Sequence, residues 1–206
     1  MQEKNAAFAS ATGKNLLAFG PRAAKMALEK FLEGDRSSKG GEKEDRMLNR
    51  KITKAAATAG HAEGTTPLNA FDNALLAAGI GNINLVKITS IIPPDADIVT
   101  VPRIKPGALI PTAYAAITGR VPGELISAGV GYALPEDRTK AGVIMEYYDK
   151  VPKAEAERVI RQMLEEAFRV RGETILELAV VATEHRVERI GCAVAAVTLL
   201  TEEDIV

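Results

Sequence analysis

From Lys51 onward, the chain alternates between short runs rich in β-branched residues and only two segments with helical spacing. Thr66-Pro67 can begin the first helix, because Thr is favourable at the N-cap and Pro at the first helical position, and Gly79 can end it. The second helical pattern covers Pro152 to Val170. Strands are expected at residues 51–60, 84–92, 108–117, 124–133, 141–148, 175–183 and 190–200. More strands than helices, with short turns between neighbours, predict an α+β fold with largely antiparallel sheets.

Composition limits the core and the class of protein. Aromatic residues make up only 4% and Trp is absent, so the core must consist of Ala, Val, Ile and Leu, which suit closely stacked sheets and helices. A net charge of −1 argues against a dedicated nucleic-acid binder, and no apolar run reaches the length of a membrane-spanning helix. Residues 1–20 lack the apolar core of a secretion signal and Cys192 is the single cysteine, so we expect a cytoplasmic protein.

A polar linker divides the chain. Residues 34–46 contain no apolar side chain and are rich in Gly, Ser and charge. We therefore predict an N-terminal extension and linker over residues 1–48 and a globular domain over 49–206. Pro21 to Leu32 could form one helix. The extension is then either disordered or loosely docked, or it is a short oligomerisation or targeting helix.

The sequence has few histidine and cysteine residues that could form a metal site or a cysteine–histidine nucleophile pair. His61 and His185 stand alone, and with one cysteine we expect no metal site. Charged neighbours place His185 at a strand end on the surface, and Cys192 is expected in the core. Gly79 and Gly81 follow a helix rather than opening one, which argues against a dinucleotide-binding loop.

Asp72 is the first of two carboxylates in apolar surroundings. On the first helix it shares a face with Leu68, Phe71, Leu75 and Leu76. An acid on a buried stripe needs a partner. Two explanations remain open from the residues alone: an internal salt bridge or helix-end interaction, or a functional acid.

Glu146 is the second carboxylate. Its neighbours Val143, Ile144, Met145 and Tyr147 make both faces of a strand apolar. Burial there would raise the pKa of Glu146 and keep it protonated near neutral pH, as a general acid requires. The alternative is a glutamate at a strand end that reaches solvent.

Four segments together resemble the pyruvoyl-dependent arginine decarboxylases: TTPLNAFDNALLAAGIGNINLVKITSIIPP, PGALIPTAYAAITGRVPGELISAGVGYALP, GVIMEYY and EHRVERIGCAVAAV. The diagnostic piece is the self-cleavage sequence [Ser/Thr]-Ser-Ile-x-Pro-Pro, present as residues 89–94. The resemblance covers about residues 51–200 and leaves the first 48 residues outside. Thr89 stands where relatives commonly have Ser, on the side of the cut that does not become the cofactor.

The resemblance implies a cofactor made from the chain itself. The Ser90 hydroxyl attacks the preceding carbonyl to give an ester, elimination breaks the chain after Thr89, and hydrolysis of the dehydroalanine leaves an N-terminal pyruvoyl group. The substrate amine then forms a Schiff base with this ketone, which serves as the electron sink that pyridoxal phosphate usually supplies. Neither pyridoxal phosphate nor a metal is expected.

The resemblance also assigns roles around this group. Glu146 matches the proton donor, and Asn84 the amide that polarises the carbonyl of residue 89. Asp72 matches the acid that pairs with the guanidinium of arginine, which explains an acid on an apolar face. The remaining substrate contacts are the side chains of Leu68 and Phe71 along the aliphatic stem, and backbone groups of Gly81 and Ile83 at the carboxylate.

The implied fold is a four-layer αββα sandwich, assembled as a trimer or dimer of trimers with active sites between subunits. The implied activity converts L-arginine to agmatine and carbon dioxide. The alternatives are the same chemistry on histidine or another basic amino acid, or an inactive structural relative. Retention of Ser90, Asn84 and Glu146 together argues against an inactive relative.

Overall fold

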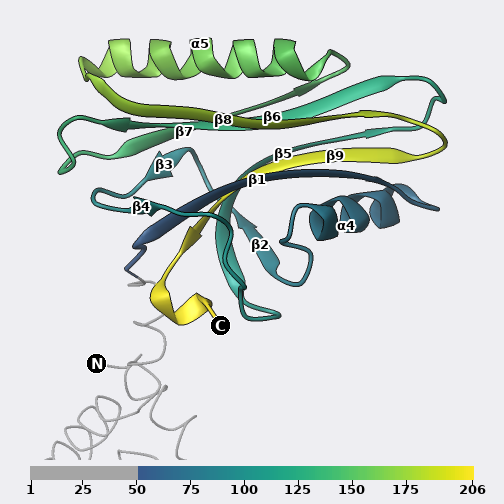
Figure 1. Cartoon of the computed structure of the whole chain (residues 1–206), viewed down its shortest axis with the longest axis horizontal. Coiled ribbons are helices and arrows are strands. Elements are labelled where there is room, and N and C mark those ends of the chain that lie inside the picture. The colour runs from purple at the N-terminus through teal and green to yellow at the C-terminus, as the bar shows by residue number, and fades with distance from the viewer. Residues whose placement is uncertain (1–50) are drawn as a thin grey trace, which may run out of the picture. The chain divides into compact units, whose positions relative to one another are not determined.

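The computed structural model describes residues 51–206, in which nine strands form two stacked sheets with one helix on each outer face (Figure 1). The helix predicted for Pro21 to Leu32 lies outside the described residues. None of the helices in residues 51–206 is long and apolar enough to cross a membrane.

The first sheet has five strands in the order β2-β5-β9-β1-β4. Their bounds are β1 (Lys54–Glu63), β2 (Asn84–Lys87), β4 (Asp97–Ile98), β5 (Leu109–Gly119) and β9 (Gly191–Leu200). The central strand β9 is antiparallel to both β1 and β5, and the short edge strands β2 and β4 are parallel to their neighbours. All ten residues of β9 are buried, as its continuous apolar run GCAVAAVTLL indicates.

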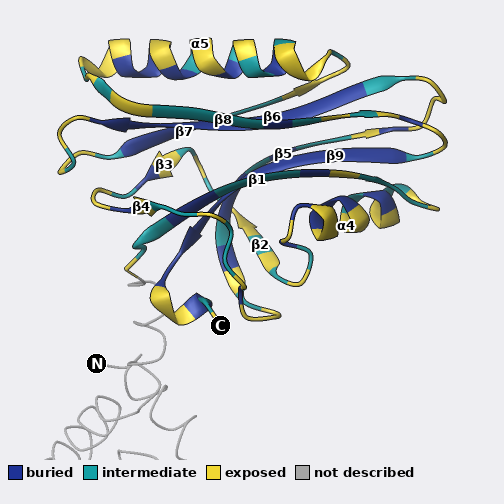
Figure 2. Cartoon of the chain, in the orientation of Figure 1, coloured by how far each residue is buried: buried dark blue, intermediate teal, exposed yellow. Residues whose placement is uncertain are grey.

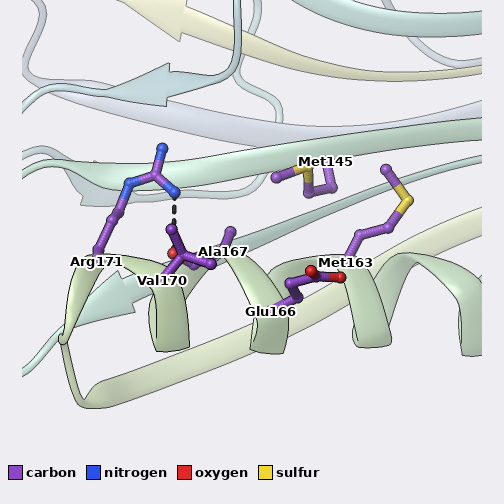
Figure 3. Close-up of a pocket in the computed structure, with 6 residues that line it drawn as sticks. All are labelled: Met145, Met163, Glu166, Ala167, Val170 and Arg171. Atoms are coloured by element: carbon purple, nitrogen blue, oxygen red, sulfur yellow. Dashed lines mark hydrogen bonds between the residues drawn. The ribbon is translucent and has the colours of Figure 1, made fainter.

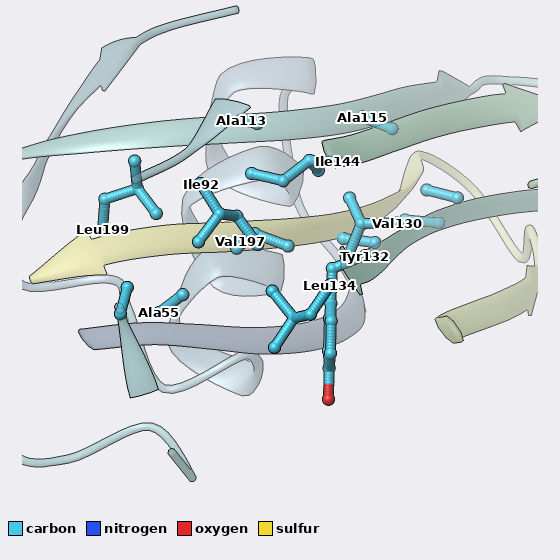
Figure 4. Close-up of a cluster of buried hydrophobic side chains, with 14 of the residues drawn as sticks. Ala55, Ile92, Ala113, Ala115, Val130, Tyr132, Leu134, Ile144, Val197 and Leu199 are labelled. Carbon is cyan, nitrogen blue, oxygen red and sulfur yellow. The ribbon is translucent and has the colours of Figure 1, made fainter. Parts of the chain in front are cut away.

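The second sheet has four strands in the order β3-β7-β6-β8, all antiparallel. Their bounds are β3 (Ile91–Ile92), β6 (Leu125–Pro135), β7 (Gly142–Asp149) and β8 (Ile175–Arg186). The inter-sheet core consists of small aliphatic side chains, among them Ala113, Val130, Ile144 and Val197, with Tyr132 the one aromatic member (Figure 4). The predicted α+β fold with mostly antiparallel sheets is confirmed.

Helix α4 (Pro67–Ala77) covers the five-stranded sheet and helix α5 (Lys153–Arg171) covers the four-stranded sheet, which gives the four layers αββα (Figure 1). The Thr66 hydroxyl caps α4 by accepting from Asn69 N at 3.2 Å. After α4, Gly79 has a left-handed φ of 78°. Both helix predictions are confirmed to within two residues at each end.

Close approach of α4 to the sheet depends on Gly60 in β1. A Cβ atom at Gly60 would lie 2.5 Å from the backbone nitrogen of Ala78 and 2.6 Å from the carbonyl oxygen of Ala74. The helix in turn presents alanines to the sheet, since Ala70 and Ala74 are fully buried. Small residues on both sides therefore set the spacing of these two layers.

The single strand predicted for residues 84–92 is wrong. The chain runs along the five-stranded sheet as β2, leaves it after Lys87, and enters the other sheet as β3 at Ile91. It then turns at Pro93-Pro94 and returns to the first sheet as β4. A continuous β-branched run does not reveal such a crossover, because each short strand satisfies the same pattern in a different sheet.

Candidate functional site

The Thr89–Ser90 peptide lies in the crossover between the two sheets. On one side, the N–H of Ile88 donates to the carbonyl of Thr112 in β5 at 3.2 Å; on the other, the carbonyl of Ser90 accepts from Ile144 N in β7 at 2.8 Å. Within residues 51–206, no backbone hydrogen bond involves Thr89, which is exposed, and Ser90 is half-buried. The peptide predicted to be cleaved therefore has backbone hydrogen bonds on both sides, at Ile88 N and at the Ser90 carbonyl, and none at Thr89.

Glu146 lies on the same strand that binds Ser90. It is two residues beyond Ile144, and because side chains alternate along a strand it shares the face of Ile144, toward the other sheet. Met145 and Tyr147 lie on the opposite face, in the cluster under α5. The carboxyl oxygen Oε2 is buried with no hydrogen-bond partner among the described residues.

The other carboxyl oxygen of Glu146 faces a cation. Oε1 lies 3.2 Å from Nζ of Lys87, the last residue of β2. The sequence predicted nonpolar surroundings for Glu146, and Lys87 makes that prediction wrong on this side. The alternative, a glutamate that reaches solvent, is also only partly right. The side chain is 29% exposed, but its oxygen Oε2 is buried.

Lys87 and Tyr114 were not identified from the sequence. Nζ of Lys87 donates to the carbonyl oxygen of Tyr114 at 3.1 Å and lies 4.6 Å from the centre of its ring. That ring lies 6.4 Å from the ring of Phe71 on α4. A row of contacts therefore runs from α4 through Tyr114 and Lys87 to Glu146. The available signal was a lysine in the otherwise apolar run before the cleavage sequence.

Asn84 begins β2, six residues before Ser90. Its side-chain amide donates to the carbonyl of Gly107 at 2.9 Å, and its backbone N–H donates to Ala108 at 2.8 Å. The contact predicted between this amide and the Thr89 carbonyl is not among the hydrogen bonds of residues 51–206. A primary amide has two hydrogens, so one remains for such a contact.

Gly81 and Ile83 lie in the loop between α4 and β2. A Cβ atom at Gly81 would lie 2.6 Å from the Leu76 side chain, so the close passage of this loop along α4 requires glycine. Ile83 packs partly buried against the cluster between α4 and the sheet. The loop thus brings backbone groups beside the exposed face of α4.

The predicted buried stripe on α4 is only partly right, because Leu75 is buried and Phe71 is partly buried but Leu68, Asp72 and Leu76 are exposed. The residues that pack on the sheet are Ala70, Ala74 and Leu75. Leu68 is 74% exposed and Leu76 50%, and Asp72 between them is also exposed. Figure 2 shows that α4 has both buried and exposed stretches around its axis. Helical periodicity cannot distinguish an alanine face from a leucine face, and here the sheet takes the smaller side chains because of the close approach at Gly60.

This exposed face changes the interpretation of Asp72. Within residues 51–206 no ion pair reaches Asp72, and it lies in the middle of α4 rather than at an end. The internal salt bridge and the helix-end interaction therefore have no support among the described residues. Asp72 remains a carboxylate on an exposed apolar helix face.

The two histidines form a pair, which corrects the prediction that they stand alone. Their rings stack with centres 5.0 Å apart, and His185 Nε2 lies 2.6 Å from Oε1 of Glu63. His185 lies at the end of β8 as predicted, but it is half-buried rather than open to solvent, with its side chain 14% exposed. Cys192 is fully buried as predicted, and burial raises the pKa of its thiol. In the described part of the chain no three His, Cys, Asp or Glu side chains group as metal ligands.

A shallow apolar groove of about 270 Å³ lies between α5 and β7 (Figure 3). The residues that line it are Met145, Met163, Glu166, Ala167, Val170 and Arg171. Met145 points to the face of β7 opposite to Glu146. The groove is therefore separate from the crossover at Ser90.

A serine on a crossover between two stacked sheets, bound to a strand that carries a half-buried glutamate, is the arrangement expected of a self-processing decarboxylase. The sequence profile described as pyruvoyl-dependent arginine decarboxylase (PvlArgDC) matches residues 54–204. The chain belongs to the pyruvoyl-dependent arginine decarboxylase family.

Individual relatives agree with this assignment. A Methanocaldococcus jannaschii protein named pyruvoyl-dependent arginine decarboxylase is 52% identical over 141 residues, which cover 68% of this chain and 86% of the relative. A Pyrococcus abyssi protein of the same name is 46% identical over 149 residues, covering 71% and 94%. Among solved structures, a pyruvoyl-dependent histidine decarboxylase at pH 8 matches with a TM-score of 0.41 and 14% identity, over 47% of this chain and 52% of that one.

Proposed function

We propose that this chain cleaves itself between Thr89 and Ser90 and decarboxylates L-arginine to agmatine and carbon dioxide. Membership of the family supports the reaction. The observation that carries the proposal is the juxtaposition at the crossover: the unpaired Thr89–Ser90 peptide is bound through Ser90 to the strand that carries Glu146. Cleavage there would leave β2 in one sheet and β3 in the other, so both new ends stay anchored.

The residues around Ser90 fit a pyruvoyl group. Its remaining carbonyl would keep the hydrogen bond from Ile144 N, and Oε2 of Glu146 is a buried carboxyl oxygen without a partner in residues 51–206. When formed, the group supplies a ketone conjugated to a carbonyl, which accepts the electron pair left when carbon dioxide departs. Pyridoxal phosphate has no role in this proposal, and neither does a metal.

Each remaining residue has a defined task in the proposal. Asn84 polarises the Thr89 carbonyl for attack by the Ser90 hydroxyl, using its second amide hydrogen. Glu146 delivers a proton to the substrate Cα after carbon dioxide leaves. Gly81 and Ile83 bind the substrate carboxylate through backbone groups.

Recognition of the guanidinium falls to the exposed face of α4. Asp72 forms a planar two-bond pair with the guanidinium, and Leu68 and Phe71 contact the aliphatic stem of the substrate. In a single chain Asp72 and Leu68 are exposed to solvent, where a carboxylate–guanidinium pair is weak. We therefore propose that a second protomer covers this face, in a trimer or dimer of trimers, and encloses arginine between subunits.

The second candidate is the same chemistry on another basic amino acid. Lysine or ornithine would meet Asp72 through a single ammonium contact, and we expect a smaller specificity constant for them than for arginine. An amine-release assay with arginine, lysine, ornithine and histidine separates the candidates. A denaturing gel of purified protein tests the cleavage, with Ser90→Ala as the control that stays one chain. Arginine conversion by uncleaved Ser90→Ala would exclude the proposed cofactor.

A further inference from the structure

We propose that Lys87 is the positioning residue for the proton donor: it holds Glu146 by Oε1 so that Oε2 carries the proton delivered to the substrate. The inference rests on the proposed function and assigns a residue to its protonation step. It starts from the unequal surroundings of the two carboxyl oxygens. Oε1 lies 3.2 Å from Lys87 Nζ, and Oε2 is buried without a hydrogen-bond partner within residues 51–206.

The asymmetry decides which oxygen carries the proton. An ammonium favours negative charge on the oxygen that it contacts, so a neutral carboxyl group at Glu146 keeps its carbonyl oxygen toward Lys87. A buried oxygen without a hydrogen-bond donor is far more costly to bury when it is charged than when it is a neutral O–H. The transferable proton therefore belongs on Oε2, and the contact at Oε1 sets the orientation of the carboxyl plane.

Lys87 itself is held by more than Glu146. Its ammonium donates to the Tyr114 carbonyl at 3.1 Å and lies 4.6 Å from the centre of the Tyr114 ring. Three contacts on one flexible side chain define the position of Nζ, although the side chain is 56% exposed. An ion pair this exposed contributes little to folding, so a purely structural role explains the arrangement poorly.

The orientation matters because two carbons compete for the proton. With a pyruvoyl group at position 90, the electron pair left by carbon dioxide would be shared between the substrate Cα and the cofactor carbon bound to the substrate nitrogen. A proton on Cα, followed by hydrolysis, releases agmatine and restores the ketone. A proton on the other carbon, followed by addition of one water molecule, releases 4-guanidinobutanal and leaves alanine at the N-terminus of the cleaved chain. Misplacement of Glu146 should therefore increase formation of this alanine.

The test compares Lys87→Met, Lys87→Arg and the control Lys150→Met. Methionine keeps much of the stem of Lys87 without its charge, and arginine restores the cation. Lys150 pairs with Glu124 and is 63% exposed, so it matches Lys87 as an exposed ion pair outside the site. For each cleaved protein we would measure kcat and KM for the amino acid that the wild type decarboxylates, and the N-terminal alanine formed per turnover by Edman sequencing.

We expect Lys87→Met to cleave itself normally. Its kcat should fall roughly tenfold or more with nearly unchanged KM, because a small displacement of a catalytic group greatly lowers the rate of its reaction. It should also form several times more N-terminal alanine per turnover. Lys87→Arg should restore most of the wild-type kcat and most of the low wild-type level of alanine formation. Lys150→Met should match the wild type in both measurements.

Three results would overturn the inference. Wild-type kcat and alanine formation in Lys87→Met would show that Lys87 does not orient Glu146. A raised KM with unchanged kcat would make it a substrate-binding residue, and failure to cleave would assign it to self-processing. A wild-type protein that cleaves itself but decarboxylates no amino acid would instead reject the proposed function. No N-terminal alanine would then form in any variant, and the inference about Lys87 would be rejected with it.

Discussion

The carbonyl of Ser90 accepts a hydrogen bond from the backbone N–H of Ile144 at 2.8 Å, and this bond joins the cleavage sequence to the strand of Glu146. Ser90 and Glu146 are 56 residues apart in the chain, yet the pairing of β3 with β7 brings their backbones together. The pairing uses only Ile91 and Ile92 of β3. A two-residue strand thus determines where Ser90, the proposed new N-terminus, lies relative to Glu146, the proposed proton donor.

Glu146→Gln tests the proton donor. Glutamine keeps the shape of the side chain but cannot supply an acidic proton, so we expect turnover to fall by roughly 10²-fold or more, the usual contribution of a positioned general acid. Self-cleavage should proceed as in the wild type, and cyanoborohydride should still trap bound substrate on the cleaved chain. Steady-state kinetics and a gel measure both. Unchanged turnover would remove Glu146 from the mechanism.

The sequence predicted the layers of the fold better than the path of the chain at the site. Strongly periodic segments such as Lys153–Arg171 and the buried run Gly191–Leu200 have the predicted type and nearly the predicted bounds. The crossover at Thr89 was not predicted, because a hydrophobic pattern reports burial without identifying the sheet that buries it.

In the candidate site, too, the sequence pattern does not show which strands and side chains meet in space. Local patterns identify the two carboxylates and the family resemblance identifies the self-cleavage sequence. Lys87 meets Glu146 and Tyr114 only through contacts between strands, which the pattern of a single sequence does not contain. Asp72 was placed on the wrong face because α4 has two apolar faces. The face with Ala70, Ala74 and Leu75 packs inside the chain, and the face with Leu68 and Leu76 is exposed.

Asp72→Asn tests arginine specificity. The variant keeps the shape of the side chain but leaves the guanidinium without its counter-ion, a loss of roughly 2 to 5 kcal/mol for truncating one partner of a buried pair. At about 1.4 kcal/mol per decade, kcat/KM for arginine should fall by roughly 30-fold to several thousand-fold. Because Asp72 is exposed in the single chain, the melting temperature should change little. A lowered melting temperature with intact arginine kinetics would contradict this role.

The histidine pair predicts a pH dependence of stability. Partial burial, followed by repulsion from His185, lowers the pKa of His61 below its ordinary value of 6.5. The unfolded chain then binds a proton more readily than the folded one, so stability is fully present above about pH 6.5 and decreases as the pH falls toward the lowered pKa. Glu63 stays ionised throughout: burial opposes this, but hydrogen bonds from His185 and from three backbone N–H groups lower its pKa to about 2.

His61→Gln isolates this contribution. Glutamine can keep a hydrogen bond to the Thr183 hydroxyl, which lies 2.7 Å from His61 Nδ1, but it does not titrate. Melting temperatures measured from pH 8 to pH 5 should therefore fall less in the variant than in the wild type. Parallel curves for the two proteins would show that His61 does not contribute to the acid dependence.

Gly60→Ala and Gly131→Ala form a pair that tests whether the position of α4 controls arginine binding. A Cβ at Gly60 would meet the helix backbone at 2.5 Å, so α4 and Asp72 must shift; at Gly131 it would meet side-chain atoms of Ile160 at 2.5 Å, under α5. Overpacking should destabilise both variants by roughly 1 to 3 kcal/mol in urea unfolding. We expect a raised KM for arginine only in Gly60→Ala, because α5 carries no proposed substrate contact. Equal KM values for arginine in both variants would mean that arginine recognition does not depend on the position of α4 on the sheet.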